Sequence, residues 1–269
     1  MKSSGSPRPL IGVTLDQELA GEYADEPYYV LRSNYAAMIS VAGGIPLALP
    51  YITDDLECLL DALDGIVVSG GMFDIDPRMY GAQIPTTGMK LKPERTDFER
   101  EIILGALRRN IPLLGICNGM QLLGVLTGAR LIQDIPADVP NAGEHMQLDP
   151  YANSAHRVEI VPETLLSTLI RSNHIDVNSI HHQAIGVAGP NVVVSAVAPD
   201  GIIEAIEVPN TRFALGVQWH PEYAAPGANG IFAGLVMAAN TYRKCGLTEN
   251  SRRSIPCSSR RCGADTPIG

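Results

Sequence analysis

Short apolar runs alternate with longer amphipathic segments along the first half of the chain. The runs are five or six residues long, as expected for strands buried on both faces, and the segments between them have helical periodicity. This alternation predicts a parallel sheet with helices on both faces. The expected strands cover residues 10–14, 45–49, 65–69 and 111–116, and the expected helices cover 28–41, 54–63 and 96–109.

The pattern changes after Leu131. Strand-like runs now follow one another, and the pair Asp200-Gly201 predicts a tight hairpin turn between two of them. The sequence therefore predicts an α/β fold: a mostly parallel central sheet flanked by helices, with antiparallel strands added in the C-terminal half. The expected strands cover 156–161, 192–198, 202–208 and 213–219, and a closing helix covers 231–243.

We expect a single domain over residues 9–245. The remainder, 246–269, is polar and rich in arginine, which predicts a disordered tail. Long irregular stretches at 81–92 and 136–155 are of the kind that often border an active site.

The pentamer Gly115-Ile116-Cys117-Asn118-Gly119 joins an expected strand to the helix-like segment 120–127. This is the pattern of a nucleophile elbow with cysteine in place of the more usual serine. Glycines suit a turn this tight, and the following helix N-terminus favours the thiolate. The alternative is a cysteine that merely packs in the core, since cysteine is among the most buried residue types.

A cysteine nucleophile needs a base, and the base needs a group that orients it. His220 stands where an apolar strand is expected to end, and Glu222 follows two residues later. On an extended segment these two side chains point the same way, so Glu222 could bond one imidazole nitrogen and leave the other facing the sulfur. Taken singly, His220 could be structural and Glu222 a solvated acid.

An oxyanion hole needs backbone N–H groups aimed at one point. Gly70 and Gly71 directly follow an expected strand, and ligands of parallel sheets bind at the carboxyl ends of strands. The N–H of Asn118 would be the second donor. The alternative for the glycine pair is a plain turn.

Composition limits the classes of partner. A net charge of −9 and a pI near 5.1 argue against nucleic acid or an anionic membrane as the main partner. Neither a signal peptide nor a membrane span is recognisable, and 45% hydrophobic residues suffice for a core. Five cysteines without a disulfide-like spacing favour a cytoplasmic protein.

We expect no metal and no cofactor. Cys257 and Cys262 lack a second pair of ligands. The histidine-rich stretch 176–183 is expected to be a loop beside the site, because neighbouring histidines on a strand point to opposite faces. The other histidines, His145, His156 and His174, are expected to be ordinary surface or loop residues.

Together these residues resemble the class I glutamine amidotransferase superfamily, whose fold is flavodoxin-like. They are most similar to the γ-glutamyl-γ-aminobutyrate hydrolase family, also called peptidase C26. The resemblance covers roughly residues 9–242. The matching motifs, in chain order, are 42–46, 63–65, 69–71, 74–77, 80–81, 98–99, 111–123, 133–135, 177–179, 181–183, 198–201, 203–207 and 216–222.

The resemblance implies a catalytic triad of Cys117, His220 and Glu222, with backbone donors at Gly71 and Asn118. The substrate-binding residues that it implies are Gly70, Gln121, Ser179 and His181. The implied reaction is hydrolysis of a γ-glutamyl amide, such as γ-glutamyl-γ-aminobutyrate in polyamine breakdown, through a glutamyl thioester. A glutaminase subunit that supplies ammonia to a separate synthetase, or a non-catalytic binding protein, remain open alternatives. The resemblance is also compatible with a homodimer.

Three departures from the family pattern touch expected walls of the substrate site. Asn118 stands where Arg or Gly is common, and its side chain is expected to line the mouth of the site. The loop at 71–74 is one residue longer than usual. The segment that starts at Arg95 lacks the frequent Asp directly after the arginine.

Overall fold

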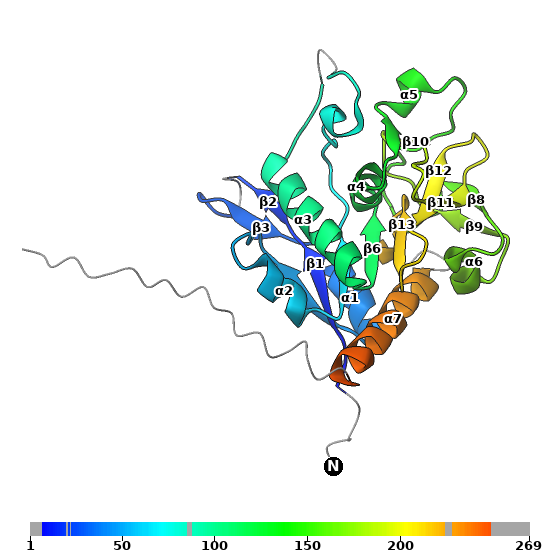
Figure 1. The fold of residues 1–269 in the computed structure, drawn as a ribbon. Helices are drawn as coiled ribbons and strands as arrows, with labels where there is room; N and C mark the ends of the chain where they lie inside the picture. The colour runs from blue at the N-terminus through cyan, green and yellow to red at the C-terminus, as the bar shows by residue number, and fades with distance from the viewer. Residues whose placement is uncertain (1–6, 20, 22, 85–87, 224–227, 249–269) are drawn as a thin grey trace, which may run out of the picture.

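The computed structural model describes residues 7–19, 21, 23–84, 88–223 and 228–248. Within them, eleven strands form one sheet (Figure 1). Its main path runs β4-β1-β5-β6-β13-β12-β11-β8-β9, and β10 joins β12 to β7. The strands are β1 (Leu10–Thr14), β4 (Ile45–Leu49), β5 (Gly65–Val68), β6 (Leu113–Ile116), β7 (Arg130–Ile132), β8 (His156–Ile160), β9 (His174–Val177), β10 (Ala184–Val187), β11 (Val193–Val197), β12 (Ile203–Glu207) and β13 (Ala214–Val217).

The pairing confirms the predicted division of the sheet. The pairs from β4 through β1, β5 and β6 to β13 are all parallel. Every pair from β13 onward, through β12, β11, β8 and β9, is antiparallel. Because β6 and β13 are neighbours and run parallel, the segments that follow them begin at the same edge of the sheet.

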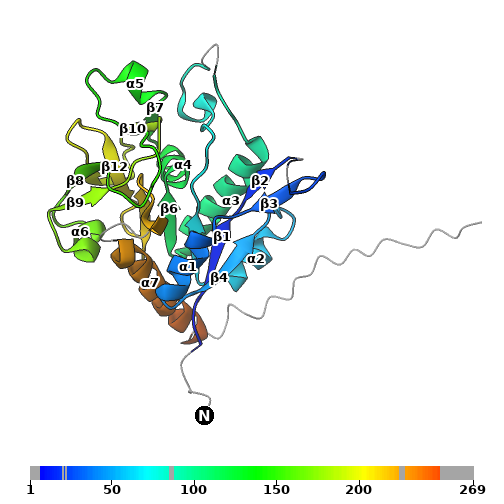
Figure 2. The same ribbon diagram turned by 180° about the vertical axis from the view of Figure 1, so that it is seen from behind.

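Helices cover both faces, as Figures 1 and 2 show from opposite sides. On one face α1 packs against α7, and Ile39, Phe232 and Leu235 are fully buried there. On the other face α2, α3 and α4 pack in a row, with Leu60 and Phe98 buried between them and the sheet. The helices are α1 (Ser33–Val41), α2 (Leu56–Ala62), α3 (Pro93–Arg109), α4 (Asn118–Leu126), α5 (Ile135–Asp138), α6 (Leu165–Ile170) and α7 (Ala228–Thr248).

The helix expected over residues 28–41 is wrong in its first part. Residues Tyr28–Val30 form β3, which pairs antiparallel with β2 (Asp16–Glu18), and the helix begins only at Ser33. Aromatic and β-branched side chains favour the strand here. This two-stranded sheet lies at the entrance of the site described below.

The C-terminal boundary also differs from the prediction. Helix α7 continues to Thr248, so the tail expected from residue 246 begins inside a helix. The rest of that expected tail, 249–269, lies outside the described residues. In the described part no helix is long and apolar enough to cross a membrane.

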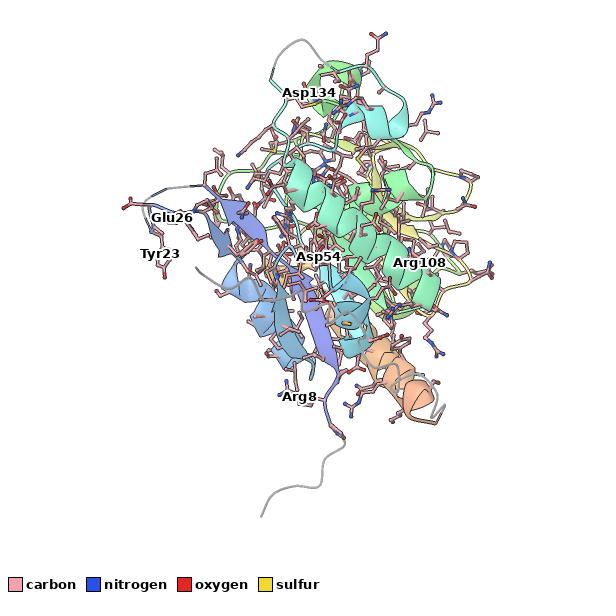
Figure 3. The ribbon with its side chains drawn as sticks, turned by 60° about the vertical axis from the view of Figure 1, so that its left-hand side comes forward. Arg8, Tyr23, Glu26, Asp54, Arg108 and Asp134 are labelled. Atoms are coloured by element: carbon pink, nitrogen blue, oxygen red, sulfur yellow. The ribbon has the colours of Figure 1, made fainter. Side chains whose placement is uncertain are left out.

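Charged side chains on the outer helices form ion pairs at the surface. Arg109 of α3 bonds Asp61 of α2 at 2.6 Å and also pairs with Glu57. Its neighbour Arg108 points outward in Figure 3 and lies 3.4 Å from Glu57. Exposed pairs of this kind contribute little to stability, so the burial beneath these helices holds the layers together.

Candidate active site

Cys117 lies at the sharp turn between β6 and α4. Its backbone has φ 53° and ψ −108°, a conformation that is unusual for a residue other than glycine. The two flanking glycines permit the turn because neighbouring backbone passes too close for a side chain. A Cβ on Gly115 would lie 2.6 Å from the carbonyl oxygen of Gly119, and a Cβ on Gly119 would lie 2.4 Å from the carbonyl oxygen of Val68. The geometry is that of a nucleophile elbow, with the sulfur at the N-terminus of α4.

His220 and Glu222 are bonded to each other beside this turn. Nδ1 of His220 lies 2.7 Å from Oε1 of Glu222, and both side chains are buried. The extended segment that we expected is absent, because β13 ends at Val217 and residues Pro221–Tyr223 form a 3₁₀ turn. The turn, rather than strand alternation, brings the carboxylate back to the imidazole.

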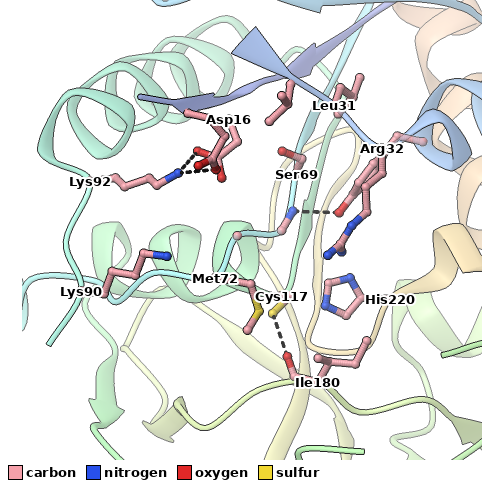
Figure 4. A pocket seen from close by; sticks show the side chains of 15 residues that line it. Asp16, Leu31, Arg32, Ser69, Met72, Lys90, Lys92, Cys117, Ile180 and His220 are labelled. Atoms are coloured by element: carbon pink, nitrogen blue, oxygen red, sulfur yellow. Dashed lines mark hydrogen bonds and ion pairs between the residues drawn. The ribbon is translucent and has the colours of Figure 1, made fainter. Parts of the chain in front are cut away.

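The charges around His220 favour its protonated form. Burial alone would lower the pKa of His220, but the carboxylate of Glu222 and the sulfur of Cys117 raise it to about 10. Figure 4 shows the Cys117 sulfur and the His220 ring next to each other at the pocket. An imidazolium beside the sulfur stabilises a thiolate, which is the nucleophilic form of cysteine.

Asn178 fixes the backbone of His220. Its Oδ1 accepts a hydrogen bond from the His220 N–H at 2.8 Å, and its Nδ2 donates to the His220 carbonyl at 2.9 Å. The Asn178 side chain therefore holds both the N–H and the carbonyl of His220, whose ring lies next to the Cys117 sulfur. The sequence placed Asn178 in a family motif without a role, since a contact across 42 positions leaves no local signal.

The Gly70-Gly71 turn is held from two sides. The N–H of Gly70 donates to the Tyr35 hydroxyl at 3.0 Å. From the other side the buried Arg95 donates to the carbonyls of Ser69 and Gly70 at 2.9 and 3.0 Å. Burial and the nearby Glu222 carboxylate raise the pKa of Tyr35 well above its usual value, so the hydroxyl stays neutral. Tyr35 was not predicted to take part in the site, and Arg95 was noted only as the start of a segment expected to touch a substrate wall.

Gly70 leaves room for the imidazole. A Cβ at this position would lie 2.8 Å from Cε1 of His220 and 3.5 Å from Cβ of Cys117. We expect Gly70→Ala to displace the His220 ring while leaving the fold intact, because only one methyl group is added. A misplacement of about 1 Å can cost roughly 10²-fold in rate. Steady-state kinetics together with a thermal unfolding curve would test this, and full activity in a folded variant would contradict it.

Asn118 is the main correction to the expected site. Its side chain does not line the mouth of the pocket: it is buried, and its Nδ2 donates to the carbonyl of Phe73 at 2.8 Å. Asn118 therefore ties the elbow to the loop at 71–74. Its backbone N–H remains the predicted oxyanion donor.

Two cavities meet at Cys117, and Figure 4 shows the side chains that line the larger one. The larger, about 320 Å³, extends past Tyr35, Ser69 and Gly70 to the entrance formed by charged side chains: Asp16, Glu18, Arg32, Lys90 and Lys92. The smaller, about 130 Å³, runs toward Gln121, His181 and Gln183. Gly71 lines both cavities, as its predicted role requires.

The predicted substrate-binding residues separate into two groups. Gly70 lines the larger cavity, and Gln121 and His181 line the smaller one. Nε2 of Gln121 donates to the carbonyl of Gln183 at 2.8 Å, which fixes the side chain there. Ser179 lines neither cavity: it is fully buried, and its hydroxyl contacts His145 instead. The structure therefore gives no contact through which Ser179 could bind substrate.

The remaining histidines agree with expectation only in part. His174 is exposed on β9, as predicted. His145 is not a surface residue: it is buried against His156, His181 and the carboxylate of Glu204. His182 points the other way, toward Asp74 at 2.9 Å. The alternation expected for adjacent histidines is thus present, but it buries one of them in a cluster that the sequence did not indicate.

A family model described as peptidase C26 matches residues 9–222. The chain belongs to the peptidase C26 family. The matched range contains every residue of the candidate site and ends at Glu222. Membership places the protein among hydrolases and glutamine amidotransferase-like proteins.

Relatives within this family align over most of the chain. A glutamine amidotransferase-like protein of Rickettsia prowazekii is 37% identical, covering 86% of this chain and 98% of its own. A protein of Mycobacterium tuberculosis named as a glutamine amidotransferase is 38% identical over 88% and 77%. The γ-glutamyl-γ-aminobutyrate hydrolase of Escherichia coli is 38% identical over 80% and 86%.

Solved structures confirm the class I glutamine amidotransferase fold. A GMP synthase-like protein of Thermoplasma acidophilum has a TM-score of 0.62 at 18% identity, covering 90% of this chain and 100% of the other. The glutaminase domain of Trypanosoma brucei CTPS with bound acivicin has a TM-score of 0.58 at 17% identity, covering 87% and 94%. At these identities the likeness concerns the fold alone.

Proposed function

We propose that the protein hydrolyses γ-glutamyl amides through a glutamyl thioester on Cys117. The observation that carries the proposal is the bonded pair His220–Glu222 beside a cysteine at a nucleophile elbow, at the meeting point of two cavities. A cysteine that only packed in the core would need neither the unusual backbone nor the neighbouring imidazole.

The proposed reaction has two steps. The Cys117 thiolate attacks the γ-carbonyl carbon, and the oxyanion accepts hydrogen bonds from the N–H groups of Gly71 and Asn118. As the C–N bond breaks, the His220 imidazolium gives its proton to the leaving amine. His220 then removes a proton from water, which attacks the thioester and releases glutamate and the thiolate. Throughout, Glu222 holds the ring by its Nδ1.

The two cavities suggest how the substrate divides. The smaller one, lined by Gln121 and His181, suits the glutamyl half, in keeping with the role that the family resemblance implies for Gln121. The larger one carries cations at Arg32 and Lys90 and leads to the open entrance, which suits the amine half. A leaving amine that bears a carboxylate would gain from those cations, and the relative named γ-glutamyl-γ-aminobutyrate hydrolase is in accord with such a substrate.

The experiment is a substrate panel with the purified protein. It contains γ-glutamyl-γ-aminobutyrate, γ-glutamyl amides of uncharged amines of similar length, and glutamine, with released glutamate as the readout. We expect the largest kcat/KM for the carboxylate-bearing amide. Equal rates for charged and uncharged amines would remove the proposed role of the cations but retain the hydrolase.

The panel also separates the alternatives. A preference for glutamine that rises when a synthetase partner is added would indicate a glutaminase subunit. No glutamate from any compound would favour the non-catalytic binding protein and overturn the proposal. Cytoplasmic location and a homodimer remain predictions that fractionation and light scattering would test.

A further inference from the structure

A second cluster of ionisable side chains surrounds the buried carboxylate of Glu204 on β12. His145 comes from the loop after α5, His156 begins β8, and His181 precedes β10. One nitrogen of each ring approaches the same oxygen: Oε1 of Glu204 lies 3.5 Å from Nδ1 of His145, 3.3 Å from Nε2 of His156 and 3.6 Å from Nε2 of His181. Three histidines therefore converge on one carboxylate that has no exposed surface.

The outward nitrogens of two of these rings already have acceptors. Nε2 of His145 lies 2.9 Å from Oδ2 of Asp200, and Nδ1 of His181 lies 2.9 Å from the carbonyl oxygen of Gln183. Both partners accept hydrogen bonds, so both outward nitrogens carry the proton. If both rings are neutral, the inward nitrogens of His145 and His181 carry no proton and can only accept hydrogen bonds.

These lone pairs face each other. Nδ1 of His145 and Nε2 of His181 are 3.3 Å apart, and two acceptors cannot bond one another. The Ser179 hydroxyl is 3.2 Å from Nδ1 of His145, but it is equally close to the His145 carbonyl and has one proton to give.

The Glu204 carboxylate adds further hydrogen-bond acceptors that lack a donor. Both oxygens of Glu204 and Nε2 of His156 lack a hydrogen bond within the described part of the chain. The cluster therefore directs several unsatisfied electron pairs at one point, which a cation would satisfy.

We propose that His145, His156 and Glu204 bind a divalent transition-metal ion such as Zn²⁺, with the fourth coordination position next to His181. The ligand atoms of the three residues lie within 4.8 Å of one another. Zinc holds nitrogen and carboxylate oxygen at about 2.0–2.2 Å, which places tetrahedral neighbours roughly 3.3 Å apart. The contacts of Glu204 with His156 and His145, at 3.3 and 3.5 Å, agree with that spacing.

The surroundings also suit a metal site. The hydrogen bond between Asp200 and His145 matches the carboxylate–histidine pairs that orient metal ligands in other proteins. His156 is likewise held by a hydrogen bond to the backbone of Glu144. Imidazole ligands select zinc and its neighbours over Mg²⁺ and Ca²⁺. A cavity of about 360 Å³ opens beside His145 and His181, which gives an ion a path of entry.

Zinc titration by calorimetry tests the site. The protein is first stripped with a chelator, and all variants carry Cys117→Ala, so that the thiol and imidazole of the active site cannot bind the ion together. We expect one Zn²⁺ per chain, and affinity weaker by roughly 100-fold or more in Glu204→Gln and His156→Gln, since outer partners alone account for 10–100-fold. His174→Gln, an exposed histidine on the neighbouring strand, is the matched control and should bind as the parent does.

Cobalt gives a readout that does not depend on the variants folding. Co²⁺ bound by histidine and carboxylate in tetrahedral geometry gives visible d–d bands without thiolate charge-transfer absorption, and added Zn²⁺ should remove these bands. No binding by the parent protein would mean that a shared proton satisfies the cluster, and the proposal would fail. Unchanged affinity in folded Glu204→Gln and His156→Gln, or a thiolate band with Co²⁺, would place the ion elsewhere and overturn it as well.

Discussion

Replacing Cys117 by alanine is expected to abolish the release of glutamate from every γ-glutamyl amide in the panel. The nucleophile is lost, and the remaining donors cannot form the thioester. In serine hydrolases the corresponding change lowers kcat by a factor on the order of 10⁶, and we expect a loss of similar size here. The measurement is single-turnover glutamate release, with mass spectrometry of the trapped protein to detect the glutamyl adduct in the wild type.

Cys58→Ala is the matched control, because Cys58 lies exposed on α2, away from the site. It should keep full activity and still form the adduct. Iodoacetamide near neutral pH gives an independent check, since Cys117 should react faster than Cys58 if the thiolate is activated. Residual glutamate release by folded Cys117→Ala at more than a small fraction of the wild-type rate would exclude the thioester.

The sequence predicted the parallel half of the sheet well because most of its strands are buried on both faces. Such strands appear as unbroken apolar runs, and residues 10–14 coincide with β1. The run 45–49 also coincides with β4, although this edge strand is largely exposed. The segment 28–30 was assigned to a helix because three residues carry too little periodicity to separate strand from helix. The short elements β2, β7, β9, β10, α5 and α6 were missed for the same reason.

The residues of the candidate site also fall into two groups: those that the sequence predicted and those that only the structure shows. Cys117, His220 and Glu222 stand in local motifs, so their neighbours in the sequence indicate them. Tyr35 stands in no motif, and the family segment that starts at Arg95 gave no hint of its contact with Gly70. The two side chains reach Gly70 across 35 and 25 positions, and only the fold makes those contacts. Their roles follow from hydrogen bonds to a backbone turn, which no residue pattern encodes.

The histidine cluster shows the limit of interpreting motifs one at a time. His156 begins β8 and Glu204 lies on β12, and the sheet places β11 between these strands. The register of two antiparallel pairings therefore decides that the imidazole reaches the carboxylate. Since a shift of one residue moves every side chain to the opposite face, the sequence alone could not predict this meeting.

Glu222→Gln is expected to lower kcat/KM by roughly 10²–10⁴-fold while the protein stays folded. The amide is nearly the same size as the carboxylate, so packing is retained. The loss comes from charge: the carboxylate of Glu222 is the first of the groups that raise the pKa of His220 to about 10 against the opposing effect of burial. Without it the buried imidazole favours the neutral form, and both the thiolate and the proton for the leaving amine become scarcer.

The pH dependence distinguishes this electrostatic role from a purely structural one. Because the folded pKa of His220 lies above its unfolded value of 6.5, the charged pair stabilises the protein fully below that value and is lost as the pH rises through about 10. The wild-type rate should therefore fall on the alkaline side near pH 10, and in Glu222→Gln this limb should move to lower pH. The free energy of unfolding of the variant should also vary less between these two pH values.

Glu94→Gln, an exposed glutamate in the first turn of α3, is the control and should leave both curves unchanged. An alkaline limb at the same pH in the wild type and in Glu222→Gln would show that the carboxylate does not set the charge of His220.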